Sequence, residues 1–205
     1  MKREITPEES GRGLAYSMWM QSPMPMVTVT KTFDVTHLVR TSKKRGIKLN
    51  TLMCWCIGKA ASGINEFYNL IVDGKLYHYD GLGIQVIVKD KNGAMTFCDI
   101  PFSDDIKQFS IEYDRTIRKG IEESLHQFRP DIMIIGTSAL VTMEFDSVVN
   151  QYTAGFVNPF LSWGRYRSHW FHKTLPISMQ FHHVLMDGEH VFTFFSRLQQ
   201  EMNNV

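Results

Sequence analysis

Long apolar runs, a secretory signal and an excess of charge of either sign are all missing from this sequence. No apolar stretch approaches the roughly 18 residues that a membrane-spanning helix needs, and no apolar segment follows the N-terminal charges as it would in a signal peptide. Lys and Arg number 22 and Asp and Glu number 21, a balance that argues against broad nucleic-acid binding. We therefore expect a cytoplasmic protein whose partners include neither a membrane nor a nucleic acid.

Cysteine is also scarce, since only Cys54, Cys56 and Cys98 are present. An odd number of cysteines in a chain without an export signal indicates reduced thiols. Cys54 and Cys56 lie two residues apart in a helical pattern, which points them to different faces and argues against a joint metal site. The sequence also lacks a glycine-rich phosphate loop, a G-x-S-x-G elbow and an H-E-x-x-H motif, and we expect no metal.

What the sequence does contain is a mixture of helical and strand patterns over 205 residues, without a repeat or a linker. We interpret it as a single domain, residues 1–205. Helices are predicted over 8–20, from an Asp34 cap to Gly46, from an Asn50 cap onward and over 103–126. Strands are predicted over 26–33, in hairpins around 73–74 and 90–93, and over 132–135, 139–145, 160–166 and 175–181. This order favours an α/β fold, in detail an α+β two-layer sandwich in which helices cover a mixed β-sheet.

The C-terminal stretch contains the pattern H-H-x-x-x-D-G, in which His182 and His183 precede Asp187. A strand pattern leads into it and an amphipathic helix leaves it, an arrangement that presents polar side chains at the rim of a fold. Histidine suits proton transfer near neutral pH, so we interpret His183 as a general base and Asp187 as the residue that secures its loop. Alternatively, Asp187 only caps the helix and the His pair has no chemical role. A metal site of His182, His183 and His190 is a further alternative, although their spacing fixes no tetrahedral geometry.

This motif and four further segments resemble the type A chloramphenicol acetyltransferases, which are CoA-dependent acyltransferases. The resemblance extends from about residue 8 to the C-terminus, and the segments follow the family's order. Besides the motif, they cover residues 12–19, 28–36, 138–147 and 158–166. The resemblance implies the family's fold and a homotrimer with active sites at subunit interfaces. It also implies that acetyl-CoA, as co-substrate, donates an acetyl group directly to a hydroxyl of a small acceptor in a ternary complex.

The resemblance further implies a role for individual residues. His183 takes the proton of the acceptor hydroxyl, and the Ser138 hydroxyl stabilises the negative charge that develops on the thioester oxygen. A buried ion pair between Arg12 and Asp187 fixes the catalytic loop. His182 is expected to be structural.

Two more sets of residues match positions that contact the substrates in this family. The candidates for the acceptor site are Met18, Trp19, Pro25 and Ser162. The candidates for the CoA site are Lys48, Arg165 and Tyr166. Lys48 belongs to a basic cluster with Lys43, Lys44 and Arg45, which suits an anionic ligand or, alternatively, is only a solvated helix end.

The expected acceptor pocket departs from the family, because Val141-Thr142 replaces a Pro-Trp step and Glu189 replaces a Phe. Three functions therefore remain. The first is a chloramphenicol O-acetyltransferase that confers antibiotic resistance. The second is an acetyltransferase that acts on another hydroxylated molecule or a thiol carrier, and the third is a non-catalytic trimeric binding protein. The joint presence of His183, Asp187, Arg12 and Ser138 favours an enzyme, because a binding protein needs no base beside an oxyanion donor.

Overall fold

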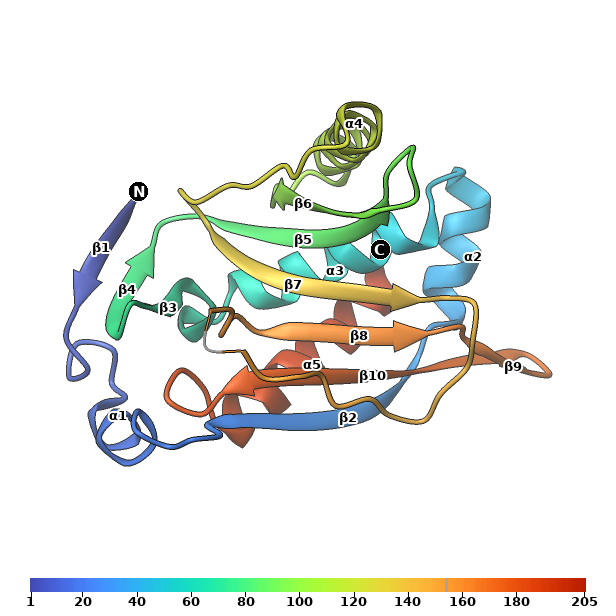
Figure 1. The fold of residues 1–205 in the computed structure, drawn as a ribbon. Coiled ribbons are helices and arrows are strands. Elements are labelled where there is room, and N and C mark those ends of the chain that lie inside the picture. The colour runs from blue at the N-terminus through green and yellow to red at the C-terminus, as the bar shows by residue number, and fades with distance from the viewer. Residues whose placement is uncertain (154) are drawn as a thin grey trace.

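The computed structural model describes residues 1–153 and 155–205, which form one large mixed sheet, one small sheet and five α-helices (Figure 1). The large sheet has the order β2-β10-β8-β7-β5-β6, and β9 pairs with β10 outside this row. Its strands are β2 (Met26–Asp34), β5 (Leu82–Lys89), β6 (Met95–Pro101), β7 (Met133–Leu140), β8 (Phe160–Gly164), β9 (Arg167–His169) and β10 (His172–His182). The pairs β5–β7 and β7–β8 are parallel and the other pairs are antiparallel. The predicted mixed α/β architecture is confirmed.

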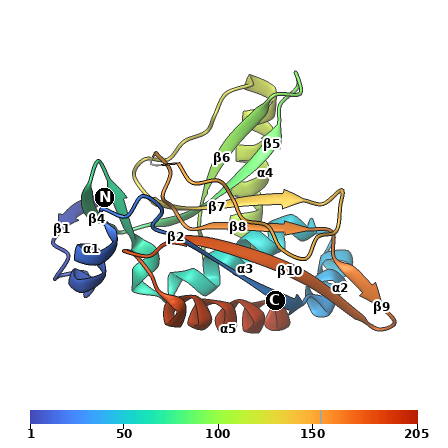
Figure 2. The ribbon, with the colours of Figure 1, turned by 60° about the horizontal axis from the view of Figure 1, so that its bottom comes forward.

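Helices cover one face of this sheet (Figures 1 and 2). They are α2 (Thr36–Arg45), α3 (Leu49–Ser62) and α5 (Gly188–Asn204). The fourth long helix, α4 (Ile106–Glu123), packs against β6 at the edge of the sheet, where Asp105 caps it by accepting a hydrogen bond from Lys107 N–H at 2.8 Å. No helix within the described ranges is long and apolar enough to span a membrane.

The sequence of β10 explains why the helices cover only one face of the sheet. Its alternate residues Leu175, Ile177, Met179 and Phe181 are at most 2% exposed and belong to the hydrophobic core between sheet and helices. The residues between them include Ser178, Gln180 and His182, which a strand directs to the opposite face. On that opposite face β10 is therefore polar, although these three side chains are at most 4% exposed.

A row of hydroxyl groups crosses the polar face. The register aligns Ser138 of β7 with Ser162 of β8, Ser162 with Ser178 of β10, and Ser178 with Thr30 of β2. The Ser178 and Thr30 hydroxyls share a hydrogen bond of 2.7 Å. Four neighbouring strands thus present hydroxyls at the same level.

The segment between β7 and β8 returns across this polar face. Val148 N–H donates to Ser178 Oγ at 3.0 Å, and Ser162 Oγ–H donates to the Asn150 side-chain oxygen at 3.1 Å. Gln180 Nε2–H donates to the Asn150 carbonyl at 2.9 Å. The polar residues of β8 and β10 therefore satisfy the backbone and side chains of an otherwise irregular segment.

The small sheet lies at the end of the molecule that also holds the N-terminus (Figure 1). It has the order β1-β4-β3, with β1 (Lys2–Ile5), β3 (Asn69–Val72) and β4 (Lys75–Tyr79). The short helices α1 (Gly13–Trp19) and η1, a 3₁₀ helix (Asn65–Tyr68), adjoin it. The predicted hairpin at Asp73-Gly74 is confirmed, since both residues adopt positive φ angles (51° and 76°) as a tight hairpin turn requires.

Several predicted elements differ from the structure. The first helix starts at Gly13 and not at residue 8, and the N-cap of α2 is Val35 and not Asp34. Asn50 does not cap α3, because the N-cap is Lys48 and the Asn50 amide instead donates to the Tyr113 hydroxyl at 2.8 Å. The strands predicted over 132–135 and 139–145 are the single strand β7, which ends at Leu140. The two predicted ranges left residues 136–138 between them unassigned. Gly136 is small because a Cβ there would lie 2.3 Å from the Phe160 ring, and the strand continues through it.

Candidate active site

The loop between β10 and α5 holds His183 in a defined orientation. Its backbone N–H donates to the Pro25 carbonyl at 2.8 Å, and its Nδ1 lies 3.2 Å from the Met186 carbonyl oxygen. A carbonyl oxygen can only accept, so Nδ1 carries the hydrogen and Nε2 keeps its lone pair. The Trp19 ring stacks on the imidazole with a centroid distance of 5.1 Å and an interplanar angle of 10°. These contacts leave Nε2 as the nitrogen that can accept a proton.

Arg12 fixes the same loop through three donors. Its Nη1 donates to Asp187 Oδ2 at 2.5 Å, its Nη2 to the His183 carbonyl at 2.9 Å, and its Nε to the Val184 carbonyl at 3.2 Å. The side chain is 13% exposed. A planar guanidinium offers several donors in a rigid arrangement, so one side chain connects both ends of the loop to the start of α1.

Asp187 performs both of the roles that the sequence offered as alternatives. Oδ2 accepts from Arg12, while Oδ1 caps α5 by accepting from Glu189 N–H at 3.1 Å and from His190 N–H at 3.4 Å. Burial raises the pKa of Asp187, but the hydrogen bond from Arg12 and the interactions with His190 outweigh it and lower the pKa to about 2. The carboxylate is therefore ionised at neutral pH and acts as an anchor.

The Asp187 anchor extends to η1 through His190. His190 Nδ1 lies 2.7 Å from Asp187 Oδ1, and its Nε2 lies 3.3 Å from Glu66 Oε1. The sequence suggested His190 only as a metal ligand and suggested no role for Glu66. No local pattern could have indicated this contact, because Glu66 lies 124 positions before His190 and the fold alone brings them together.

His182 is buried, with 4% of its surface exposed. Its Nδ1 accepts a hydrogen bond from Val184 N–H at 3.2 Å. Burial, followed by the neighbouring His183, lowers its pKa to about 4, so His182 is neutral at physiological pH. Among residues 1–153 and 155–205, no group of three or more His, Cys, Asp or Glu side chains could hold a metal ion.

A pocket of about 660 Å³ lies over the polar face of the sheet and includes Ser138. Aromatic rings of Phe97, Phe128, Phe156 and Phe160 contribute much of its lining. Its other lining residues are Gln85, Ile87, Met95, Val149, Asn150, Gln151, Thr153, Asn158 and Gln180. None of these described lining residues carries a charge, and the volume falls within the range of sites for small ligands. The pocket thus suits an uncharged, partly aromatic molecule.

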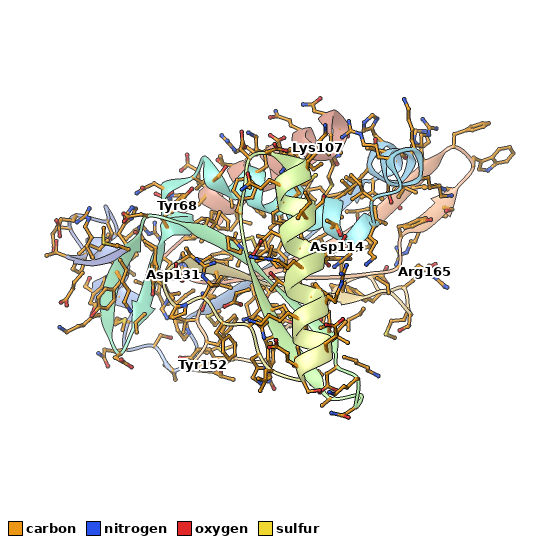
Figure 3. All side chains as sticks on the ribbon, turned by 90° about the horizontal axis from the view of Figure 1, so that it is seen from above. Tyr68, Lys107, Asp114, Asp131, Tyr152 and Arg165 are labelled. Carbon is orange, nitrogen blue, oxygen red and sulfur yellow. The ribbon has the colours of Figure 1, made fainter. Side chains whose placement is uncertain are left out.

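A second pocket of about 260 Å³ lies beyond the C-terminal ends of β7 and β8. Arg165 and Tyr166 line it together with Asn50, Met53 and Trp163, among others. Figure 3 shows Arg165 near the edge of the molecule, away from Tyr152 of the β7–β8 segment. Lys48 does not line this pocket but directly precedes two residues that do, and its Nζ lies 3.4 Å from Asp114 Oδ1 of α4.

The predicted catalytic residues do not meet within one chain. Ser138 is aligned through Ser162 with Ser178 of β10, and His183 lies five residues further on, directly after the last residue of that strand. At about 3.3 Å per residue and about 4.8 Å between strands, the separation is roughly 17 Å along the strands and roughly 10 Å across them, about 19 Å in all. A base must approach the proton that it takes to within hydrogen-bonding distance, so one chain alone does not bring His183 to an acceptor at Ser138.

The chain matches the model of the family described as chloramphenicol acetyltransferase over residues 12–199. The chain belongs to this family. Chloramphenicol acetyltransferase 3 of Escherichia coli is 26% identical in an alignment of length 191 that covers 86% of this chain and 85% of that protein. A chloramphenicol acetyltransferase of Clostridium perfringens is 26% identical in an alignment of length 207 that covers 98% of this chain and 94% of that protein.

Solved structures agree with the family assignment at the level of the fold. A chloramphenicol acetyltransferase superposes with a TM-score of 0.85 at 23% identity, covering 98% of this chain and 100% of that chain. A dihydrolipoamide acetyltransferase of Azotobacter vinelandii reaches 0.69 at 17% identity, covering 98% and 91%. The predicted fold and the assignment as an acyltransferase are confirmed.

In this acyltransferase, the predicted site residues fall into three groups. His183, Asp187, Arg12, Trp19 and Pro25 lie together at the β10–α5 loop. Met18, next to Trp19, is 58% exposed. Ser138 lines the larger pocket, whereas Ser162 is fully buried beside it and bonds to Asn150. Arg165 and Tyr166 line the smaller pocket.

We expect the Arg12→Ala variant of this acyltransferase to lose both stability and activity. Removal of one partner from a fully buried ion pair costs ~3–5 kcal/mol, but the Asp187 side chain is 33% exposed. The free energy of unfolding should therefore fall by roughly 2–3 kcal/mol. Urea unfolding and acetyl-transfer rates measure the two effects. Arg12→Lys keeps the charge but not the several donors of the guanidinium, so its stability and activity should lie between those of wild type and Arg12→Ala. An Arg12→Ala protein with wild-type stability and activity would contradict the anchoring role.

Proposed function

We propose that this protein is an acetyl-CoA-dependent chloramphenicol O-acetyltransferase with His183 as its general base. The observation that carries the proposal is the orientation of His183, whose Nδ1 is engaged by the Met186 carbonyl and whose ring stacks on Trp19. A base that is held in one tautomer and one plane is already oriented for proton transfer and does not have to reorient before it reacts. His182, buried and engaged by Val184 N–H, is not the base.

The reaction follows from the groups at these positions. His183 Nε2 takes the proton of the acceptor hydroxyl as the hydroxyl oxygen forms a bond to the carbonyl carbon of acetyl-CoA. The carbonyl electron pair moves to its oxygen, and the Ser138 O–H donates a hydrogen bond to the resulting oxyanion. When the carbonyl reforms, the C–S bond breaks and the CoA thiolate takes the proton from His183. The acetylated acceptor and CoA, now a thiol, then leave, and the histidine returns to its starting state.

This reaction needs two copies of the chain, and we assign it to the interfaces of a homotrimer. The roughly 19 Å between His183 and Ser138 in one chain means that His183 serves the Ser138 of a neighbouring subunit. Apolar side chains are exposed in both regions: Leu14 and Met18 near the His183 loop are 75% and 58% exposed, and Val141 and Val149 after Ser138 are 57% and 69% exposed. Contact between these regions of two subunits would cover both sets.

The two pockets fit the two substrates. Chloramphenicol is an uncharged aromatic alcohol, which matches the uncharged lining and aromatic rings of the larger pocket. The smaller pocket reaches Val141, three residues after Ser138, and Trp163, next to Ser162. There, Arg165 and Tyr166, with Lys48 and the basic last turn of α2 nearby, would bind CoA and its phosphates. Acetyl transfer to chloramphenicol would make the protein a resistance enzyme.

The test is the release of free thiol from acetyl-CoA with and without chloramphenicol. We expect release that depends on chloramphenicol and yields one acetylated product per thiol. If other alcohols support thiol release and chloramphenicol does not, the protein is an acetyltransferase and chloramphenicol is not its acceptor. A folded protein that binds neither acetyl-CoA nor chloramphenicol would refute the enzymatic proposal.

A further inference from the structure

Asn150 lies at the point where the β7–β8 segment meets the row of hydroxyls. Its side-chain oxygen accepts the Ser162 hydroxyl hydrogen at 3.1 Å, and its carbonyl accepts from Gln180 Nε2 at 2.9 Å. Ser162 is the register partner of Ser138 on the next strand. The Asn150 amide is therefore held one side chain away from the residue that marks the reacting end of the larger pocket.

The Asn150 side-chain nitrogen, Nδ2, is buried and has no hydrogen-bond partner among the residues that the structure describes. The buried amides that line the same pocket are different. Gln85 Nε2 donates to Asp99 Oδ1 at 2.8 Å, Asn158 Nδ2 to the Ile134 carbonyl at 2.8 Å, and Gln180 Nε2 to Asn150 itself. Of these four amides, Asn150 is thus the one whose nitrogen makes no hydrogen bond to a described residue, and buried donors are normally satisfied.

Either orientation of the Asn150 side-chain amide leaves one of its two ends without a hydrogen-bond partner. Ser162 engages one end of the Asn150 amide. If the amide were turned over, Nδ2 would donate to Ser162 and the oxygen would be left without a partner instead. With Oδ1 on Ser162, the Ser162 hydroxyl is the donor, and the Nδ2 of Asn150, a residue that lines the pocket, stays without a partner.

We infer that Asn150 selects the acceptor: its Nδ2–H donates to an oxygen of the acceptor that lies close to the hydroxyl being acetylated. The inference rests on the proposed function, because it assumes that the larger pocket holds the acceptor. It narrows the acceptor class to uncharged, partly aromatic alcohols that carry a second hydroxyl, an ether or a carbonyl within about three carbons of the reacting hydroxyl. Chloramphenicol, with its 1,3-diol and amide carbonyl, belongs to this class, whereas a simple arylalkanol does not.

The inference can be tested with two acceptors and two substitutions. Chloramphenicol is compared with 3-(4-nitrophenyl)propan-1-ol, which keeps the nitrophenyl ring and the primary hydroxyl but has no other oxygen near that hydroxyl. The variants are Asn150→Leu, which keeps the volume, and Asn150→Ala, which does not crowd the pocket. Asn65→Ala, at an exposed asparagine of η1, is the matched control. Thermal unfolding identifies any variant that fails to fold.

We expect both Asn150 variants to lower kcat/KM for chloramphenicol about tenfold, the effect of one neutral hydrogen bond to a substrate, mainly through KM. The value for the arylpropanol should stay within about twofold of wild type. A purely structural role would lower both values together, and this result, like no change in either, would overturn the inference.

Calorimetric titration of chloramphenicol into the intact oligomer separates this inference from the proposed function. Equal dissociation constants for wild type and Asn150→Leu would refute the inference while leaving the acetyltransferase in place. If the wild type itself neither binds nor acetylates chloramphenicol, the proposed acceptor is wrong and the role of Asn150 falls with it. Weaker binding of chloramphenicol to Asn150→Leu than to wild type supports the inference.

Discussion

Replacement of His183 by alanine is expected to lower kcat by ~10²–10⁴, the contribution of a positioned general base. The variant lacks the Nε2 lone pair that the contacts of Met186 and Trp19 present. The fold should survive, because the backbone bonds of residue 183 to Pro25 and Arg12 do not involve the imidazole. The measurement is chloramphenicol-dependent thiol release under saturating acetyl-CoA, together with urea unfolding.

A matched control and a rescue experiment separate chemistry from structure. His169→Ala, at an exposed residue of β9, should retain wild-type kcat. Free imidazole should restore part of the rate of His183→Ala, because it can fill the space left by the side chain and act as the base. A His183→Ala protein with wild-type kcat would show that another group accepts the proton.

Ser138→Ala is expected to lower kcat by ~10²–10³, the effect of removing one donor from an oxyanion site. The Ser138 side chain lines the larger pocket, and no described residue bonds to its hydroxyl, in contrast to Ser162 and Ser178. Its hydroxyl is therefore available to a ligand. Stability should change little, because Ser138 is only half-buried. The same thiol-release assay measures the loss, and Ser138→Cys should retain only part of the activity because the thiol is a weak donor.

A mixture of the two inactive variants tests the proposed interface directly. If His183 of one subunit serves Ser138 of its neighbour, co-expression of His183→Ala and Ser138→Ala subunits in equal amounts gives some sites with both residues intact. Random assembly makes about one quarter of all sites intact, so roughly a quarter of wild-type activity should return. If both residues act within one chain, every site lacks one of them and the mixture should stay as inactive as its components.

Local features of the chain were predictable because they depend on neighbouring residues. The Asp73-Gly74 turn needs two residues that tolerate positive φ, and the sequence places them between two strand patterns. The alternation of apolar and polar residues in β10 similarly predicts which of its faces is buried under helices. The H-H-x-x-x-D-G motif and its four companion segments identified the family, which the match over residues 12–199 confirms.

Contacts between distant residues were not predictable from local patterns. The strand β1 was missed because its four residues form a strand only by pairing with β4, some 70 positions later. Asn50 looks like a helix cap, but its amide is taken by Tyr113 of α4. Glu66 joins the Asp187 anchor through His190 for the same reason.

The sequence by itself determined the family, the mixed sheet and the residue types that acyl transfer requires. Only the tertiary structure decided which of those residues stand together. It places Arg12 and Trp19 around His183 and joins Asn150 to Ser162. It also separates Ser138 from His183 by two strands across the sheet and by the C-terminal end of β10. These distances depend on strand order and register, which arise from packing across the whole sheet and are not encoded in any one segment.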